Sequence, residues 1–148
     1  MRSLLLALTV VAFSTDTNIG DWKLNLEKST FMPGPAPRSQ TLHYKPWGTD
    51  GVVATADGVA ADGKPTHWQF RAKYDGKDNR FSGNPDADAV AFTRIDANTI
   101  VAITKIKGKV TGITRAVISA DGHTRTLMQT GTNARGQDMN NLVVYDKQ

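Results

Sequence analysis

The chain has 148 residues, with 18 Lys and Arg against 14 Asp and Glu, a formal net charge of +4 and no cysteine. This length predicts one domain with a core of its own, and the lack of cysteine excludes disulfides, thiolate metal sites and a cysteine nucleophile. Basic and acidic residues are interspersed without long runs of one sign, so the sequence predicts no nucleic-acid partner.

Residues 1–19 are typical of a signal peptide followed by a short polar spacer. The positive start, Met1-Arg2, precedes a largely apolar run over residues 4–13, and small residues follow at the positions that determine cleavage. This run is much shorter than the roughly 20 residues of a membrane span. We therefore expect an exported bacterial protein, periplasmic or secreted, without stable membrane insertion. The alternative is that the apolar run forms a buried first strand or helix.

Short segments of alternating apolar and polar residues follow, separated by four Asp-Gly pairs that are typical of β-hairpins. No segment has a helical period. We predict nine strands, over residues 21–26, 40–47, 52–59, 66–74, 89–95, 99–107, 109–119, 124–131 and 139–146.

Consecutive hairpins leave two open sheet edges, and closing the sheet into a barrel removes both of them. The sequence therefore predicts an all-β fold, an antiparallel up-and-down β-barrel of about eight to nine strands that occupies residues 20–148 as a single domain. The two long connections, residues 27–39 and 75–88, are expected at opposite ends of this barrel. The first is rich in proline and is expected to be a stiff segment that covers or plugs one end.

Alternation is clearest over residues 66–74, where Trp68, Phe70 and Tyr74 share one face. We expect this aromatic face, together with Tyr44, to point into the barrel. We also predict an interior cavity, because many positions expected inside carry small residues, namely Ala54, Ala56, Ala72, Ala91, Ala102, Gly112 and Ala116.

Three arginines, Arg94, Arg115 and Arg125, lie on predicted strands. An arginine that points into an apolar barrel binds a ligand carboxylate through two charge-assisted hydrogen bonds, whereas most strand arginines face water. Arg94 and Arg115 alternate in step with apolar neighbours. These two are therefore the stronger candidates for an inward orientation.

The sequence predicts no catalytic group, metal site or cofactor. Its three histidines, His43, His67 and His123, lie on different elements without the close spacing of metal ligands. His43 and His67 alternate against apolar neighbours and are expected to face solvent. No nucleophile elbow or phosphate-binding loop is present.

Gly20-Asp21-Trp22 opens the first predicted strand and matches the G-x-W signature of lipocalins. With the segments over residues 22–25 and 28–37 and the Asp-Gly hairpins, it makes the chain resemble small secreted bacterial lipocalin-like proteins of the calycin type. This resemblance implies a calycin-type barrel in which Trp22 packs across the closed end. It also implies a cup for a small hydrophobic or amphipathic molecule.

We therefore expect a non-catalytic protein, with a monomer favoured, that binds a small hydrophobic or amphipathic ligand. The candidate ligand-binding residues are Tyr44, Trp68, Phe70, Tyr74, Arg94 and Arg115. The alternative is a packed barrel that acts through its surface as an inhibitor or interaction module of the cell envelope. Its candidate surface residues are Val101, Ile103, Leu142 and Val144.

Overall fold

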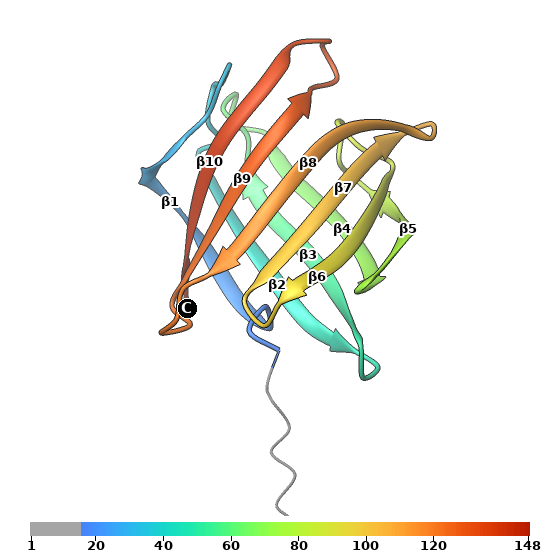
Figure 1. The fold of residues 1–148 in the computed structure, drawn as a ribbon. Helices are drawn as coiled ribbons and strands as arrows, with labels where there is room; N and C mark the ends of the chain where they lie inside the picture. The colour runs from blue at the N-terminus through green and yellow to red at the C-terminus, as the bar shows by residue number, and fades with distance from the viewer. Residues whose placement is uncertain (1–15) are drawn as a thin grey trace, which may run out of the picture.

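The computed structural model describes residues 16–148, which form a closed β-barrel (Figure 1). Its ten strands are β1 (Gly20–Thr30), β2 (Ser39–Trp47), β3 (Gly51–Val59), β4 (Pro65–Lys73), β5 (Asp75–Ser82), β6 (Ala89–Asp96), β7 (Thr99–Ile106), β8 (Lys109–Ile118), β9 (Thr124–Thr132) and β10 (Asp138–Lys147). Each strand pairs antiparallel with the next, and β1 also pairs with β10. The predicted up-and-down barrel is confirmed, with ten strands. Residues 16–148 contain no helical segment that could span a membrane.

The strand that the sequence did not predict is β5, which lies in the expected loop over residues 75–88. Its sequence is polar and lacks alternation, so intrinsic β-propensity does not explain it. Pairing with β6, from Asp75 opposite Thr93 to Arg80 opposite Ala89, holds β5 in the sheet. The additional strand reverses the direction of the chain once more. The connections over residues 31–38 and 83–88 therefore lie at the same end of the barrel, and the expectation of opposite ends is wrong.

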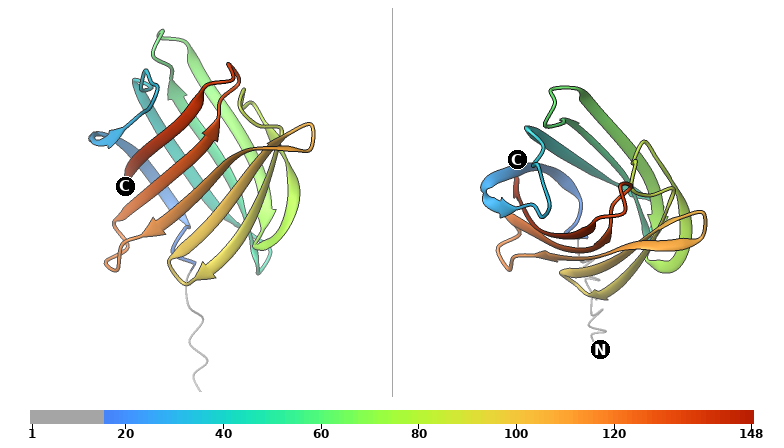
Figure 2. Two further views of the ribbon diagram at one scale, coloured as in Figure 1. Left: turned by 45° about the horizontal axis from the view of Figure 1, so that its top comes forward. Right: turned by 90° about the horizontal axis from the view of Figure 1, so that it is seen from above.

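Residues 16–19 lie at the other end of the barrel, which we call the closed end (Figures 1 and 2). There Asn18 is 1% exposed and Trp22 is fully buried. The indole Nε1 of Trp22 donates a hydrogen bond to the carbonyl oxygen of Asn18 at 3.0 Å. The folded part of the chain thus includes residues 16–19, whereas residues 1–15 of the expected leader lie outside the described residues.

The proline-rich connection over residues 31–38 is attached to the barrel at both of its ends. The N–H of Asn140 donates to the carbonyl oxygen of Met32 at 2.9 Å, and the N–H of Met32 donates to Oδ1 of Asn141 at 3.0 Å. At its other end the N–H of Arg38 donates to the carbonyl oxygen of Val59 at 2.8 Å. These hydrogen bonds hold the connection against β10 and β3.

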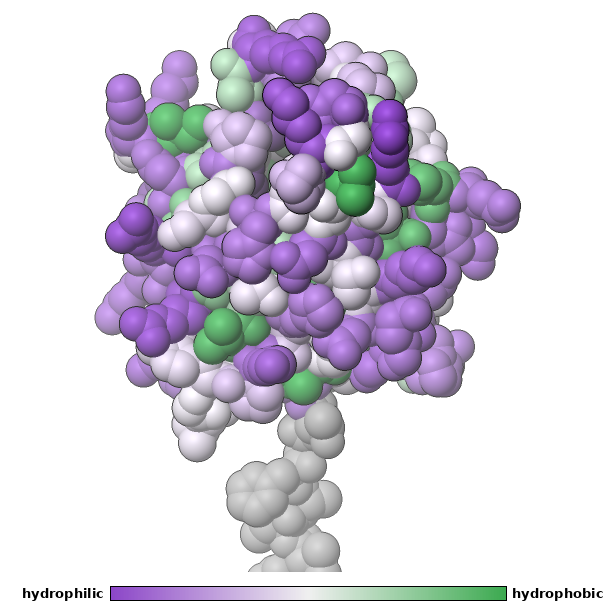
Figure 3. All heavy atoms as spheres, turned by 180° about the vertical axis from the view of Figure 1, so that it is seen from behind, coloured by the Kyte–Doolittle hydropathy of each residue, from purple (hydrophilic) through white to green (hydrophobic). Residues whose placement is uncertain are grey.

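The core lies inside the barrel and includes a continuous aromatic group from β4, β5 and β6. Phe70 contacts Phe81 and Phe92 edge to face, with ring centroids 5.1 and 5.0 Å apart, and stacks on Trp68. Burial of these rings removes a large apolar area from water, at about 25 cal/mol per Å². The outer face of β2, β3 and β4 is predominantly hydrophilic (Figure 3).

The four residues of the surface alternative do not form one exposed set. Leu142 is exposed, Val101 and Ile103 are half-buried, and Val144 is buried. The N–H of Val144 donates to the hydroxyl of Ser29 at 2.9 Å, because the end of β1 departs from regular pairing and lies against this part of β10.

Candidate functional site

A cavity of about 170 Å³ lies inside the barrel. Its wall is mainly aromatic and aliphatic, and Ala102 and Ala116 are among the small residues that leave the space open. An apolar cavity of about 150 Å³ accommodates benzene, whereas sites for drug-sized ligands measure about 300–1,000 Å³. The cavity therefore matches a ligand of roughly benzene size.

Three of the six candidate ligand-binding residues line this cavity. Tyr44 and Phe70 are buried and Trp68 is half-buried, and all three contribute to its wall. Tyr74 and Arg94 lie instead at the closed end, where the guanidinium carbon of Arg94 is 4.1 Å from the centroid of the Tyr74 ring.

Arg115 is exposed on the outer face of β8, so the inward orientation expected for it is wrong. The inward residues of β8 are small, and Gly112, Thr114 and Ala116 face the interior, whereas Ile113 lies outside with Arg115. Apolar residues occur on both faces of this strand. Alternation therefore did not identify the inner face.

Arg125, the arginine that the sequence favoured less, points into the barrel and lines the cavity. It is 2% exposed. One terminal nitrogen donates to Oδ1 of Asn18, and the other donates to the hydroxyl of Tyr44 at 3.2 Å. Its guanidinium carbon lies 4.4 Å from the centroid of the Tyr44 ring.

The guanidinium of Arg125 is incompletely satisfied within residues 16–148. Its Nε has no hydrogen-bond partner there, and no carboxylate of these residues lies within 4.0 Å of it. A buried charge without a counter-ion is costly. The cavity is therefore lined by a charged guanidinium that has an unused hydrogen-bond donor.

Two further polar side chains at the cavity are already paired. The hydroxyl of Tyr145 donates to Oε1 of Gln40 at 2.6 Å. Burial raises the pKa of Tyr145, and nearby Tyr44 adds to this effect while Arg125 opposes it. Tyr145 is therefore a neutral hydroxyl at physiological pH and does not compensate the charge of Arg125.

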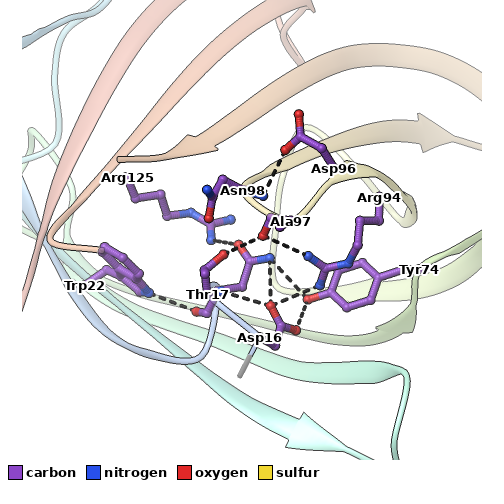
Figure 4. Close-up of polar contacts among 10 residues, drawn as sticks. Asp16, Thr17, Trp22, Tyr74, Arg94, Asp96, Ala97, Asn98 and Arg125 are labelled. Carbon is purple, nitrogen blue, oxygen red and sulfur yellow. Dashed lines mark hydrogen bonds and ion pairs between the residues drawn. The ribbon is translucent and has the colours of Figure 1, made fainter. Parts of the chain in front are cut away.

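A hydrogen-bond network at the closed end lies between Arg94 and Arg125 and contacts both of them (Figure 4). The carboxylate of Asp16 accepts hydrogen bonds from the hydroxyl of Tyr74 at 2.6 Å and from the N–H of Asn18 at 3.0 Å, and it forms an ion pair with Arg94 at 3.0 Å. Arg94 therefore has a carboxylate partner, whereas Arg125 has two uncharged partners, the amide of Asn18 and the hydroxyl of Tyr44.

The same network shifts the pKa values of its two acidic groups in opposite directions. Burial raises the pKa of Asp16, but the hydrogen bonds from Tyr74 and Asn18 and the charge of Arg94 outweigh it, so the net pKa lies below the usual 3.8. Burial and the adjacent Asp16 carboxylate raise the pKa of Tyr74. Asp16 is therefore charged and Tyr74 neutral at physiological pH.

The two strand histidines lie on the outer face beside carboxylates. Nδ1 of His43 is 2.8 Å from Oδ1 of Asp21, and Nδ1 of His67 is 2.7 Å from Oδ1 of Asp57. Over the part of the chain that the structure describes, no group of three or more His, Asp or Glu side chains is arranged to hold a metal ion.

No protein-family model and no curated protein sequence matches the chain. Solved β-barrels do resemble its structure. A redesigned β-barrel has a TM-score of 0.50 and 14% identity over 89% of this chain and 92% of its own. EF1p2_mFAP2b bound to DFHBI has a TM-score of 0.50 and 11% identity over 89% and 94%. The zebrafish ileal bile acid-binding protein complexed with cholic acid has a TM-score of 0.51 and 10% identity over 89% and 99%.

At these identities the likeness establishes the fold alone. The chain is a closed, antiparallel up-and-down β-barrel, the architecture that these solved structures share.

Proposed function

We propose that the chain is an exported, non-catalytic binding protein for a small amphipathic anion, held in the interior cavity with its charged group against Arg125. The observation that carries this proposal is the buried guanidinium of Arg125, which lines the cavity and lacks a carboxylate partner among residues 16–148. A ligand carboxylate would supply the counter-ion and accept charge-assisted hydrogen bonds.

The volume of the cavity limits the rest of the ligand. About 170 Å³ suits a single ring or a short aliphatic chain. The wall formed by Phe70, Phe92 and Leu127 would contact this apolar part, and its desolvation would supply most of the binding free energy. The ligand-bound barrels that share the fold support small-molecule binding as the general role.

The direct test is isothermal titration of the protein with benzoate and with its neutral analogue benzyl alcohol. Arg125→Met removes the cation, and Arg115→Met is the matched control because Arg115 is exposed on the outer face. Loss of a charge-assisted hydrogen bond, about 1.5–3 kcal/mol, predicts roughly a ten- to hundredfold weaker affinity of Arg125→Met for benzoate. The control should bind benzoate as the unmodified protein does.

A second variant tests the same site in case Arg125→Met does not fold. Ala116→Leu fills part of the cavity without removing a polar group and should also abolish benzoate binding. The melting temperature of each variant reports whether it folds. Equal affinity for benzoate and benzyl alcohol, or benzoate binding that survives in a folded Ala116→Leu, would refute the proposed site.

A further inference from the structure

A cleft opens on the outside of the barrel between β4 and β5. The two strands pair at only two positions, Gln69 opposite Ser82 and Phe70 opposite Phe81. Beyond them β4 continues along β3 to Lys73, and β5 lies along β6 from Asp75. The strands are therefore separated between these pairs and their connection at Tyr74, and the cleft between them has a volume of about 580 Å³.

Two arginines line this cleft, Arg71 from β4 and Arg80 from β5. No acidic residue lines it, and among residues 16–148 neither arginine has a carboxylate within 4.0 Å. The nearby carboxylate on β5, that of Asp78, is instead paired with Lys105 at 2.9 Å. The cleft is therefore a region of positive potential without internal compensation.

One wall of the cleft is aromatic. Trp47 lines it beside Val53, and the guanidinium carbon of Arg71 lies 5.2 Å from the centroid of the Trp47 ring. The ammonium of Lys73 lies 6.0 Å from the same ring. An aromatic face next to a fork of donors offers stacking and bidentate hydrogen bonds to one molecule.

We propose that this cleft is a second ligand site, specific for a planar organic anion whose acidic group binds between Arg71 and Arg80 while its ring lies against Trp47. Its volume of about 580 Å³ falls within the range of small-molecule sites, about 300–1,000 Å³, and exceeds that of the interior cavity. Gln69, Asn79 and Ser82 supply further polar groups at its edge.

The outer site is separate from the interior one. Among residues 16–148, Phe70 is the one lining residue that they share, and its ring packs on Phe81 at the last pair of β4 and β5. Arg71, Arg80 and Trp47 line the cleft alone. The proposal for the cleft therefore does not depend on Arg125 or on ligand binding inside the barrel.

The test is an NMR titration with 2-naphthoate and with the neutral 2-naphthalenemethanol. The indole N–H signals distinguish the sites, because Trp47 lines the outer cleft and Trp68 lines the interior cavity. We expect 2-naphthoate to move the Trp47 signal saturably. The double variant Arg71→Gln/Arg80→Gln should bind at least tenfold more weakly, and Arg115→Gln, an exposed arginine on another strand, should bind normally.

Three outcomes would overturn the outer site: movement of the Trp68 signal alone, equal binding of the alcohol, or undiminished binding by the folded double variant. The titration is repeated on Arg125→Met to separate the two proposals. Unchanged movement of the Trp47 signal there is expected, and loss of it would show that the naphthoate response arises inside the barrel.

Discussion

The side chain of Asn18 is expected to contribute strongly to the stability of the folded protein at the closed end of the barrel. It is 1% exposed, and its Oδ1 accepts a hydrogen bond from Arg125 while its Nδ2 contacts the hydroxyl of Tyr74 at 3.2 Å. Asn18→Ala removes both contacts. It also leaves a buried guanidinium with a second unsatisfied nitrogen, in addition to Nε.

The expected cost follows from these contacts. The hydrogen bond to the charged Arg125 is worth about 1.5–3 kcal/mol and the contact with Tyr74 about 0.5–1.5 kcal/mol. We therefore expect Asn18→Ala to lower the free energy of unfolding by about 3 kcal/mol. For a chain of this size each kcal/mol corresponds to about 2–4 °C, so the melting temperature should fall by about 6–12 °C.

Urea unfolding followed by tryptophan fluorescence measures this change, since Trp22 packs directly beside Asn18. The matched control is Asn140→Ala on β10, because Asn140 is exposed and has no side-chain hydrogen bond within residues 16–148. The control should change stability by less than about 0.5 kcal/mol. A loss below about 1 kcal/mol for Asn18→Ala would show that residues 16–19 do not close the barrel in the way the contacts indicate.

Two further predictions concern acid stability and backbone conformation. The pKa of Asp16 is lower in the folded state, so its contribution is fully present above pH 3.8 and is lost as the pH falls below it. Asp16→Asn should therefore make the free energy of unfolding less dependent on pH below 3.8. The measurement is urea unfolding at a series of acidic pH values, and the same pH dependence in the variant and the unmodified protein would contradict the prediction. At Gly131 (φ 153°) a Cβ would clash with the backbone oxygen of Thr111, whereas at Gly122 (φ 77°) it meets open space. Gly131→Ala should thus lower the melting temperature clearly more than Gly122→Ala, and equal losses would argue against close strand contact at Gly131.

The hairpin positions could be predicted because they depend on local backbone chemistry. Gly63, Gly76 and Gly122, three of the four glycines in the Asp-Gly pairs, have a positive φ of 73–89°. Gly51 in the fourth pair begins β3 instead, and Gly48 supplies the positive φ (63°) in that connection. The local sequence therefore predicted the position of this chain reversal correctly, but it did not identify the glycine that adopts the positive φ.

The inner face of β8 and the role of Arg125 could not be predicted in this way. On β8 the outward Ile113 is larger than the inward Thr114 and Ala116, because aromatic side chains of β4–β6 already occupy much of the interior. The inward orientation of Arg125 depends on the register of β9 against the neighbouring strand β8, in which Arg125 lies opposite the buried Ile118. Alternation within one strand contains neither piece of information.

The contrast between Arg94 and Arg125 leads to one more prediction about ligand choice. Both arginines contact the segment over residues 16–19, but Arg94 pairs with the carboxylate of Asp16 whereas Arg125 contacts the uncharged amide of Asn18. Asn18→Asp would give Arg125 an internal counter-ion at the same position. If the free charge of Arg125 recruits an anionic ligand, this nearly isosteric change should weaken benzoate binding at least tenfold while benzyl alcohol binding stays the same. Unchanged affinity for benzoate in a folded Asn18→Asp protein would mean that the charge of Arg125 does not select the ligand, and that the cavity binds by apolar contact alone.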